Sequence, residues 1–400
     1  MPTNPLIVGL VMLVFFVISL LTNILGPLIP EFIESFQLSL GLAGFLPFSF
    51  FVAYAVMSIP AGMFLERYRE KPVLVSAFAI AFVGSLAFAL FPYYRVGLAS
   101  VFLIGMGMAT LQVAINPLLR VAGGEQNFAF NGVLSQLVFG LASFISPLVY
   151  SYFVGTAGLP WYSLYWLFAG VTLVMIAVIA ATPLPRVELK ADERSGGLAT
   201  YSALVRHPHV LLYFGGIFCY VAMEQGVSNW ISQFLSSYHG FDPRTTGASA
   251  VSYFWGLMTA GCVLGLVLLK LLDSRKVLIA AAATAILMLT VALFGPARVS
   301  LIAFPLIGFC IAVMWSVIFS LALNSVAEHH GSLSGILCTA VVGGAVGPLL
   351  VGWQGDRIGL RTAMLILYLP LAYILSIGFW ARPLVTNATV SFKKDAAVAP

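Results

Sequence analysis

Residues 5–30 read PLIVGLVMLVFFVISLLTNILGPLIP, a run without a single charged side chain. An α-helix rises about 1.5 Å per residue, so a run of this length can cross the roughly 30 Å hydrocarbon core of a bilayer. No basic segment precedes the run, it contains no cleavage site of small residues, and it is longer than the apolar core of a signal peptide. We therefore expect it to be retained as a first membrane-spanning helix.

Apolar runs of about 20 residues recur along nearly the whole chain. Charged residues, proline and glycine separate twelve of them, at 5–30, 40–65, 73–92, 96–120, 127–154, 160–182, 210–238, 245–271, 276–295, 299–325, 332–354 and 361–381. Runs of this length fit helices rather than the shorter strands of a barrel. The sequence thus predicts an all-α polytopic membrane protein with twelve transmembrane helices.

The composition agrees with a membrane protein. Of the 400 residues, 61% are hydrophobic and 8% are charged, and the mean hydropathy is +1.03, whereas an ordinary soluble domain is roughly 45–50% apolar. The net charge of +5 comes from basic residues spread among short loops, without the basic patch that nucleic-acid binding needs. Cys219, Cys262, Cys310 and Cys338 lie inside apolar runs without metal-ligand spacing. We therefore expect reduced thiols, no metal site and no nucleic-acid partner.

The longest polar stretch divides the twelve runs into two sets of six. We predict an N-terminal bundle over 1–182, a cytoplasmic linker over 183–209, a C-terminal bundle over 210–382 and a cytoplasmic tail over 383–400. With the N-terminus in the cytoplasm, fourteen of the 19 Lys and Arg residues fall on the cytoplasmic side and five on the other. Because basic residues concentrate in cytoplasmic loops, this distribution predicts a multi-pass protein of the inner membrane with both termini in the cytoplasm.

The two halves repeat each other at an offset of about 204 to 205 residues. Phe36 corresponds to Phe241, and Val73-Leu74 to Val277-Leu278. Two parallel six-helix repeats are the symmetry of the major facilitator superfamily, in which the binding site lies between the halves near the middle of the membrane. The chain resembles this superfamily.

The loop after the second run, GMFLERYREK at 62–71, resembles the superfamily's signature G-x-L-x-D-R-x-G-R-K, with Glu66 for the Asp and Arg69 for the second Gly. An acid beside basic residues at helix ends can bridge two helices in one state and release them in another. We assign Glu66 and Arg67 a gating role. The alternative is a basic cytoplasmic loop without such a role.

The most specific string is LQVAINP at 111–117, which resembles the L-[EQ]-x-A-x-N-P signature of the fucose:proton symporter family of sugar transporters. Strings in both halves agree with this family, including LTNILGP at 21–27 and FSLAL at 319–323. Gln112 and Asn116 are four residues apart and share one helix face, where amides can donate to and accept from a polyol. The alternative role for these amides is to hold neighbouring helices together.

Two departures from the family change the expected mechanism. Its proton-coupled members carry an Asp in the first span and a Glu in the fourth, and the matching residues here are Asn23 and Gln112. An amide cannot bind and release a proton, so this carboxylate route is absent. In the fifth span the family pattern R-x-N-L-A-Q-x-x-N keeps its Gln as Gln136 and loses the Arg and both Asn. We expect Gln136 to bind the substrate in a pocket where other residues of the family pattern are replaced.

Glu224 is the carboxylate nearest the middle of a long apolar run, in YVAMEQGVSNW at 220–230, which resembles the family's Y-V-G-x-E-x-x-x-x-x-W. A charge at this depth costs roughly 2.5–3.5 kcal/mol on insertion scales, so it indicates a functional site. Glu224 could bind and release the coupling proton, it could supply the charged oxygen of a sodium site, or it could be a permanently neutral acid. We expect Asn229, Trp230 and Trp315 to line the site with Asn23, Gln112 and Gln136, because sugar sites favour flat apolar faces beside a few fixed polar groups.

The sequence therefore predicts a secondary transporter that imports a hexose or similar polyol with a cation, a proton in preference to sodium, by rocking of two bundles. The alternatives are a proton-coupled exporter of a small organic solute and an uncoupled sugar facilitator. The chain contains no nucleotide-binding loop, nucleophile elbow or HExxH string, so we expect no enzyme. The expected partners are a sugar and the lipid bilayer; we expect a monomer and no cofactor besides the coupling cation.

Overall fold

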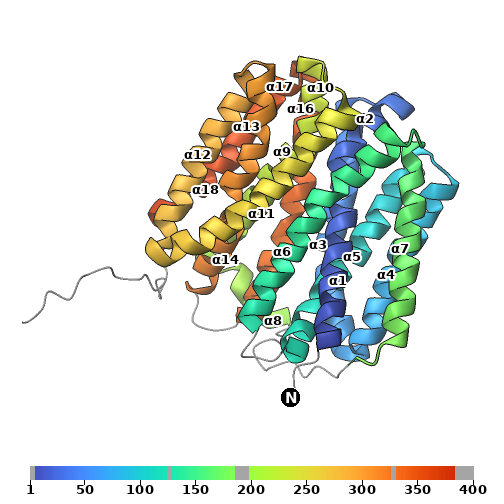
Figure 1. Cartoon of the computed structure of the whole chain (residues 1–400). Helices are drawn as coiled ribbons and strands as arrows, with labels where there is room; N and C mark the ends of the chain where they lie inside the picture. Colours follow the sequence, from blue (N-terminus) through green and yellow to red (C-terminus); the bar gives the residue numbers. More distant parts are fainter. Residues whose placement is uncertain (1–4, 124–127, 185–197, 326–329, 383–400) are drawn as a thin grey trace, which may run out of the picture.

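The structure is a computed structural model that describes residues 5–123, 128–184, 198–325 and 330–382. Within these ranges the regular structure is helical, without strands. Twelve of the described segments are long and apolar enough to cross a membrane, which confirms the predicted all-α fold. Figure 1 shows them in two groups, blue to green from the N-terminal half and yellow to red from the C-terminal half.

The elements of the N-terminal half, followed by the short linker helix α8, are α1 (Pro5–Thr22), α2 (Leu25–Phe36), α3 (Leu40–Tyr68), α4 (Glu70–Leu90), α5 (Tyr94–Gly123), α6 (Phe128–Tyr150), η2 (Ser151–Thr156), η3 (Trp161–Ser163), α7 (Leu164–Ala181) and α8 (Leu198–Val205). The elements of the C-terminal half are α9 (Pro208–Ser228), α10 (Ile231–His239), η4 (Pro243–Gly247), α11 (Ala248–Leu271), α12 (Ser274–Phe294), α13 (Ala297–Ile311), α14 (Met314–Leu323), α15 (His330–Thr339), η5 (Ala340–Val342), α16 (Gly343–Ile358), α17 (Leu360–Ala363), η6 (Met364–Leu367) and α18 (Tyr368–Trp380).

Local signals in the sequence set several helix ends. The Ser39 side chain accepts a hydrogen bond from the Leu42 amide at the start of α3, and Asp273 accepts one from the Arg275 amide at the start of α12. Each acceptor satisfies an amide that has no partner inside its helix. The Arg275 guanidinium also donates to Asp273 and holds the pKa of that carboxyl below its ordinary value. Gly240, with φ of 68°, ends α10 in the left-handed conformation that favours glycine.

The buried apolar side chains form two clusters, one for each half. Phe32, Phe78 and Phe88 belong to the N-terminal cluster, and Phe234 and Phe304 belong to the C-terminal cluster. These are the separate cores expected of two bundles. The exact domain boundaries stay a prediction, because much of the linker, residues 185–197, and the tail from 383 lie outside the described residues.

Two spanning segments are broken at matching places in the two halves. The first breaks between α1 and α2 at Asn23, and the seventh breaks between α9 and α10 at Asn229. Each Asn side-chain nitrogen donates back one turn: from Asn23 to the Ser19 carbonyl at 3.2 Å, and from Asn229 to the Gln225 carbonyl at 2.9 Å. Non-helical backbone at this depth is tolerated where it is buried in protein or lines a cavity. The first segment therefore continues beyond the predicted end at residue 30, to Phe36.

The two ends of the molecule carry different elements (Figure 1). We call the end with α8 and the N-terminus the linker side, and the end with α2, α10 and α17 the distal side. Near the distal side the bundles interlock, because Ile29 and Ala43 pack into the C-terminal cluster while Ala248 packs into the N-terminal cluster.

Candidate functional site

A cavity of about 520 Å³ lies between the two bundles, and we call it the central cavity. Its volume falls within the roughly 300–1,000 Å³ typical of small-molecule sites. The cavity reaches toward the linker side as far as Phe15 of α1 and Leu269 of α11. Its polar and aromatic lining residues come from both bundles: Thr22, Asn23, Tyr54, Gln112, Gln136 and Ser143 from the N-terminal one, and Tyr220, Glu224, Gln225, Trp255, Thr259, Trp315 and Ser316 from the C-terminal one.

Glu224 is held in the wall of the central cavity by two neighbours on α9. The Tyr220 hydroxyl donates to Glu224 Oε1 at 2.8 Å, and Gln225 Nε2 donates to Glu224 Oε2 at 3.4 Å. The side chain is 9% exposed, and among the described residues no Lys, Arg or His forms an ion pair with it. The carboxyl group therefore faces the cavity with hydrogen-bond donors but without a fixed counter-ion.

An aromatic wall stands beside this carboxyl group. The Trp315 ring lies 6.0 Å from the Tyr220 ring between centroids, and it stacks on Phe319 at 6.0 Å with an interplanar angle of 20°. Trp315 belongs to α14, which follows the break at the end of α13. A flat apolar face next to a carboxyl group and amides is the combination that suits the two faces of a sugar ring.

On the opposite wall, Asn23 belongs to a network inside the N-terminal bundle. Its Nδ2 donates to Ser143 Oγ at 2.9 Å and to Ser19 Oγ at 3.2 Å, and the two hydroxyls lie 2.7 Å apart. This network ties α1 to α6. The orientation of the Asn23 amide, with its nitrogen committed to the bundle, leaves the carbonyl oxygen as the atom for a ligand.

The structure brings together five of the seven residues predicted to bind substrate or cation. Asn23, Gln112, Gln136, Glu224 and Trp315 all line the central cavity. Their individual roles stay predictions.

The other two predicted residues lie elsewhere. Asn229 lines a smaller cavity next to the central one. Trp230 is fully buried, and its indole nitrogen donates to the Pro348 carbonyl at 3.1 Å inside the C-terminal bundle. The rest of the central cavity contains residues that the sequence reasoning did not select, among them Thr259 and Ser316.

An ion pair closes the distal side, and the sequence reasoning missed it. Arg244 of η4 donates from Nε to Glu31 Oε1 at 2.7 Å and from Nη2 to Glu31 Oε2 at 3.3 Å. The Tyr150 hydroxyl donates to the same Oε1 at 2.8 Å. Glu31 is 2% exposed in α2, so Glu224 is not the only carboxylate buried in a spanning segment of the described residues. We call the Glu31–Arg244 contact the distal ion pair.

A second polar contact joins the bundles close by. Both carboxylate oxygens of Asp356, near the end of α16, accept from backbone amides at the start of α3, from Leu40 at 2.7 Å and from Gly41 at 2.8 Å. The first amides of a helix lack partners inside the helix and favour a negative charge. This cap and the distal ion pair fasten the N-terminal bundle to the C-terminal bundle on the distal side.

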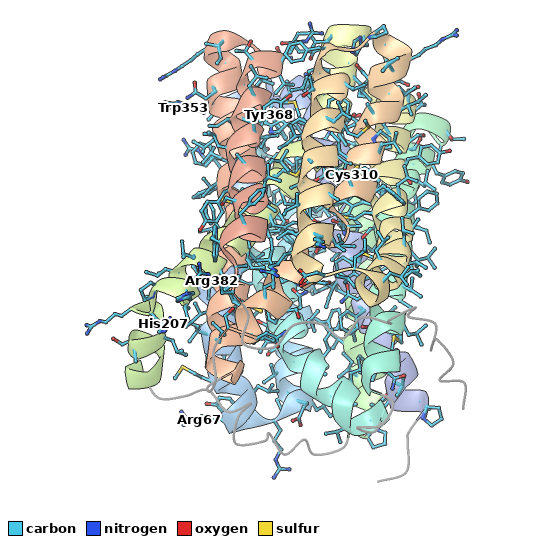
Figure 2. The ribbon with its side chains drawn as sticks, turned by 90° about the vertical axis from the view of Figure 1, so that its left-hand side faces the viewer. Arg67, His207, Cys310, Trp353, Tyr368 and Arg382 are labelled. Atoms are coloured by element: carbon cyan, nitrogen blue, oxygen red, sulfur yellow. The ribbon has the colours of Figure 1, made fainter. Side chains whose placement is uncertain are left out.

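The residues predicted to act as a gate lie at the other end of α3. Arg67 is exposed and lies over the Tyr68 ring, 5.3 Å from its centroid. Figure 2 shows Arg67 at the linker side with His207, far from Trp353 on the distal side. The Glu66 side chain lies outside the described residues. The gating role of Glu66 and Arg67 stays a prediction.

The model of the Major Facilitator Superfamily matches residues 11–348. The chain belongs to this superfamily. Proteins of this class are membrane transporters with paired six-helix repeats, which agrees with the prediction of a transporter rather than an enzyme.

Named relatives of this superfamily protein agree with the resemblance seen in its sequence. The chain is 29% identical over 388 residues to a glucose/galactose transporter of Brucella abortus, with 92% of each chain covered. It is 24% identical over 407 residues to the L-fucose-proton symporter of Escherichia coli, covering 93% of this chain and 92% of that one.

Solved structures show the same fold. The crystal structure of the Escherichia coli fucose:proton symporter matches with a TM-score of 0.68 at 22% identity, over 94% of this chain and 98% of that chain. A bacterial homologue of the human lysosomal transporter Spinster matches with a TM-score of 0.74 at 15% identity, over 95% and 97% of the two chains.

Proposed function

We propose that this protein carries a sugar, a hexose or similar polyol, across the membrane together with a cation, by exposing the central cavity to the two sides in turn. The observation that carries the proposal is the composition of the cavity: one carboxyl group, Glu224, among amides and aromatic rings from both bundles. Relatives named as glucose/galactose and fucose-proton transporters support a sugar as the substrate. Import is the expected direction.

The amides and rings have complementary tasks in this proposal. Gln112 and Gln136 are exposed to the cavity from the N-terminal bundle, where an amide can both donate to and accept from a sugar hydroxyl. Trp315 offers its flat face from the C-terminal bundle. A substrate that bridges the two bundles binds best when they are correctly spaced around it, so its binding energy favours the states that close around it.

Glu224 would couple the cation to the sugar. A proton bound at Oε2 removes an acceptor from Gln225 Nε2, whose bond to that oxygen is long at 3.4 Å. The released amide is then available to the substrate in the same cavity. The sugar therefore binds best when the carboxyl group is protonated, and an empty, deprotonated carrier can return without it.

A proton fits the surroundings of Glu224 better than sodium does. A sodium ion needs a shell of several oxygen ligands, whereas the groups that hydrogen-bond to the carboxyl group are donors, the Tyr220 hydroxyl and the Gln225 amide nitrogen. We therefore favour proton coupling.

Uptake by proteoliposomes tests this function. Purified protein is reconstituted, and labelled hexoses are offered with a proton gradient, with a sodium gradient or with neither. The proposal expects accumulation of at least one sugar with the proton gradient. Accumulation only with sodium would overturn proton coupling, sugar exchange that no gradient drives would indicate a facilitator, and the absence of any sugar flux would overturn the function.

We further infer that both termini face the cytoplasm and that the protein resides in the inner membrane. The distribution of basic residues supports this orientation. A tag at the C-terminus that a protease cleaves in intact spheroplasts would contradict it. The monomeric state stays a prediction.

A further inference from the structure

A small cavity lies next to the central cavity, on its distal side. It shares Thr22, Asn23, Gln225 and Trp255 with the central cavity, so the two are separated by side chains rather than by helices. On the distal side it ends where Gly26 of α2 meets the end of α9, so closely that a Cβ on Gly26 would lie 2.7 Å from the Ser228 carbonyl oxygen. The small cavity leaves no room for a water molecule in this state.

Three side chains of this cavity each bury one polar atom that has no hydrogen-bond partner among the described residues. Ser228 and Asn229 are each 2% exposed, and Trp255 is 4% exposed. Ser228 Oγ, Asn229 Oδ1 and Trp255 Nε1 have no partner, although buried polar groups in proteins are nearly always bonded. Three unpaired groups around one cavity indicate that they bind something in another state of the protein.

The three groups are complementary to a hydroxyl group. The Trp255 N–H can only donate, the Asn229 carbonyl oxygen can only accept, and the Ser228 hydroxyl can do both. A hydroxyl group also donates and accepts. A bare cation would face the positive end of the indole N–H, and an anion would face the Asn229 oxygen, so neither fits as well.

The positions of these groups connect them to the coupling carboxyl group. Asn229 Nδ2 donates to Gln225 Oε1 at 2.9 Å, and Gln225 Nε2 donates to Glu224 Oε2 at 3.4 Å. Asn229 also lies at the break between α9 and α10, opposite Asn23 at the matching break of the N-terminal bundle. Motion of the two bundles on the distal side would thus widen the small cavity between two helix breaks.

We propose that the small cavity is a distal subsite that opens when the distal side opens and there binds an O–H group through Ser228, Asn229 and Trp255. The proposal rests on the proposed sugar transport. The O–H group belongs to the sugar as it enters from the distal side, and in the state described here the collapsed subsite releases it toward the central cavity. The subsite therefore serves binding from one side of the membrane only.

Side-specific kinetics test the subsite. Ser228→Ala removes one unpaired polar atom and keeps the rest of the side chain; Ser237→Ala, on the exposed face of α10, is the matched control. Sugar transport is measured from each side in vesicles of known orientation. We expect Ser228→Ala to raise KM from the distal side about tenfold, which corresponds to one lost hydrogen bond, and to leave KM from the linker side unchanged. Equal effects from both sides, or none, would overturn the proposal.

Deoxy sugars and melting curves complete the test. If the bound group is a sugar hydroxyl, one monodeoxy analogue lacks it, and the KM measured for that analogue from the distal side will be the same in the wild type and in Ser228→Ala. If Ser228→Ala instead lowers the affinity for every analogue equally, the bound group is water and the sugar assignment is wrong. Ser228→Ala should melt no lower than the wild type, because the atom that it loses is unpaired, and a lower Tm would contradict this. A wild type that transports no sugar would overturn the proposed function and the subsite with it, whereas normal wild-type transport with equal effects of Ser228→Ala from the two sides overturns the subsite alone.

Discussion

At the scale of single residues, the proposed coupling depends on Glu224. The Glu224→Gln variant keeps the shape of the side chain and, with one donor and one acceptor group, resembles the protonated acid, but it cannot bind and release a proton. We expect it to lose gradient-driven accumulation of sugar and to keep exchange of labelled for unlabelled sugar. Exchange needs no net movement of protons, so the two assays on one preparation separate coupling from folding. Full accumulation by the variant would refute the coupling role.

Gln136 tests the substrate contacts of the N-terminal bundle. Its amide is exposed in the central cavity on α6, so Gln136→Ala should raise KM for the sugar about tenfold, equivalent to about 1.4 kcal/mol, with little change in Tm. The control is Gln233→Ala on α10, whose amide donates to Ser237 Oγ outside the cavity. Initial rates of uptake at a series of sugar concentrations measure both. A KM unchanged in Gln136→Ala would exclude it from the site.

The sequence predicted the position of the buried carboxyl group but not its surroundings. A charge in an apolar run is rare enough to stand out, but helical spacing places both Ser228, one turn after Glu224, and Tyr220, one turn before, on the same face. The observed partner is Tyr220, one turn before, because helical side chains lean toward the N-terminus of their helix. Trp230 lies beyond the break at Asn229, so the periodicity of α9 could not predict which way it points.

At the scale of helices, glycines let α16 pack directly against α9. A Cβ on Gly343 would overlap the Phe218 carbonyl oxygen, and a Cβ on Gly347 would overlap that of Ala222. Small residues one turn apart allow such close backbone approach in membranes. This contact holds α9, and with it Glu224, against the segment that includes η5 and α16.

Gly347→Ala should therefore destabilise the protein. The added methyl group has to displace backbone rather than a flexible side chain, and overpacking of this kind costs about 1–3 kcal/mol. The matched control is Gly170→Ala on α7, where a Cβ meets nothing within 4 Å and where Ala is the better helix former. Melting curves in detergent should show a lower Tm for Gly347→Ala and an equal or higher one for Gly170→Ala. The opposite order would disprove the close contact.

The spanning helices could be predicted almost completely, whereas their breaks could not. Long apolar runs reveal helices through composition alone. The break at Asn229 contains no proline, and the one at Asn23 precedes Pro27 by a full turn. Each break is stabilised by an Asn that donates to a carbonyl one turn back and by burial between the bundles, which are tertiary features. The helix breaks, and the small cavity between them, thus needed the three-dimensional structure.

At the scale of the whole molecule, the polar contacts described between the two bundles lie toward the distal side. The distal ion pair joins residues 213 positions apart in the sequence, and the Asp356 cap joins residues 316 apart. Neither pairing follows from local sequence, because it depends on how two independently packed bundles face each other. The internal repeat predicted two bundles with a site between them. It could not predict at which end of the molecule the bundles close over that site.

The closed distal side leads to a prediction about access to the central cavity. Cys262 lines the cavity, so a membrane-impermeant thiol reagent should reach it from the linker side and not from the distal side. A variant that keeps Cys262 and replaces Cys219, Cys310 and Cys338 by Ala isolates this signal. Bound sugar should protect Cys262, because it would occupy the same cavity.

Arg244→Gln should then make Cys262 reactive from the distal side. Removal of the guanidinium leaves Glu31 buried without its counter-charge, and an unpaired buried charge strongly disfavours the closed arrangement, whereas opening hydrates the carboxylate. Arg298→Gln, at the exposed start of α13 on the same side, is the control and should label like the parent protein. Mass spectrometry of vesicles treated from one side measures the modified fraction. If Arg244→Gln folds but remains unreactive from the distal side, the distal ion pair does not hold the bundles closed, and the Asp356 cap at the start of α3 becomes the contact to remove next.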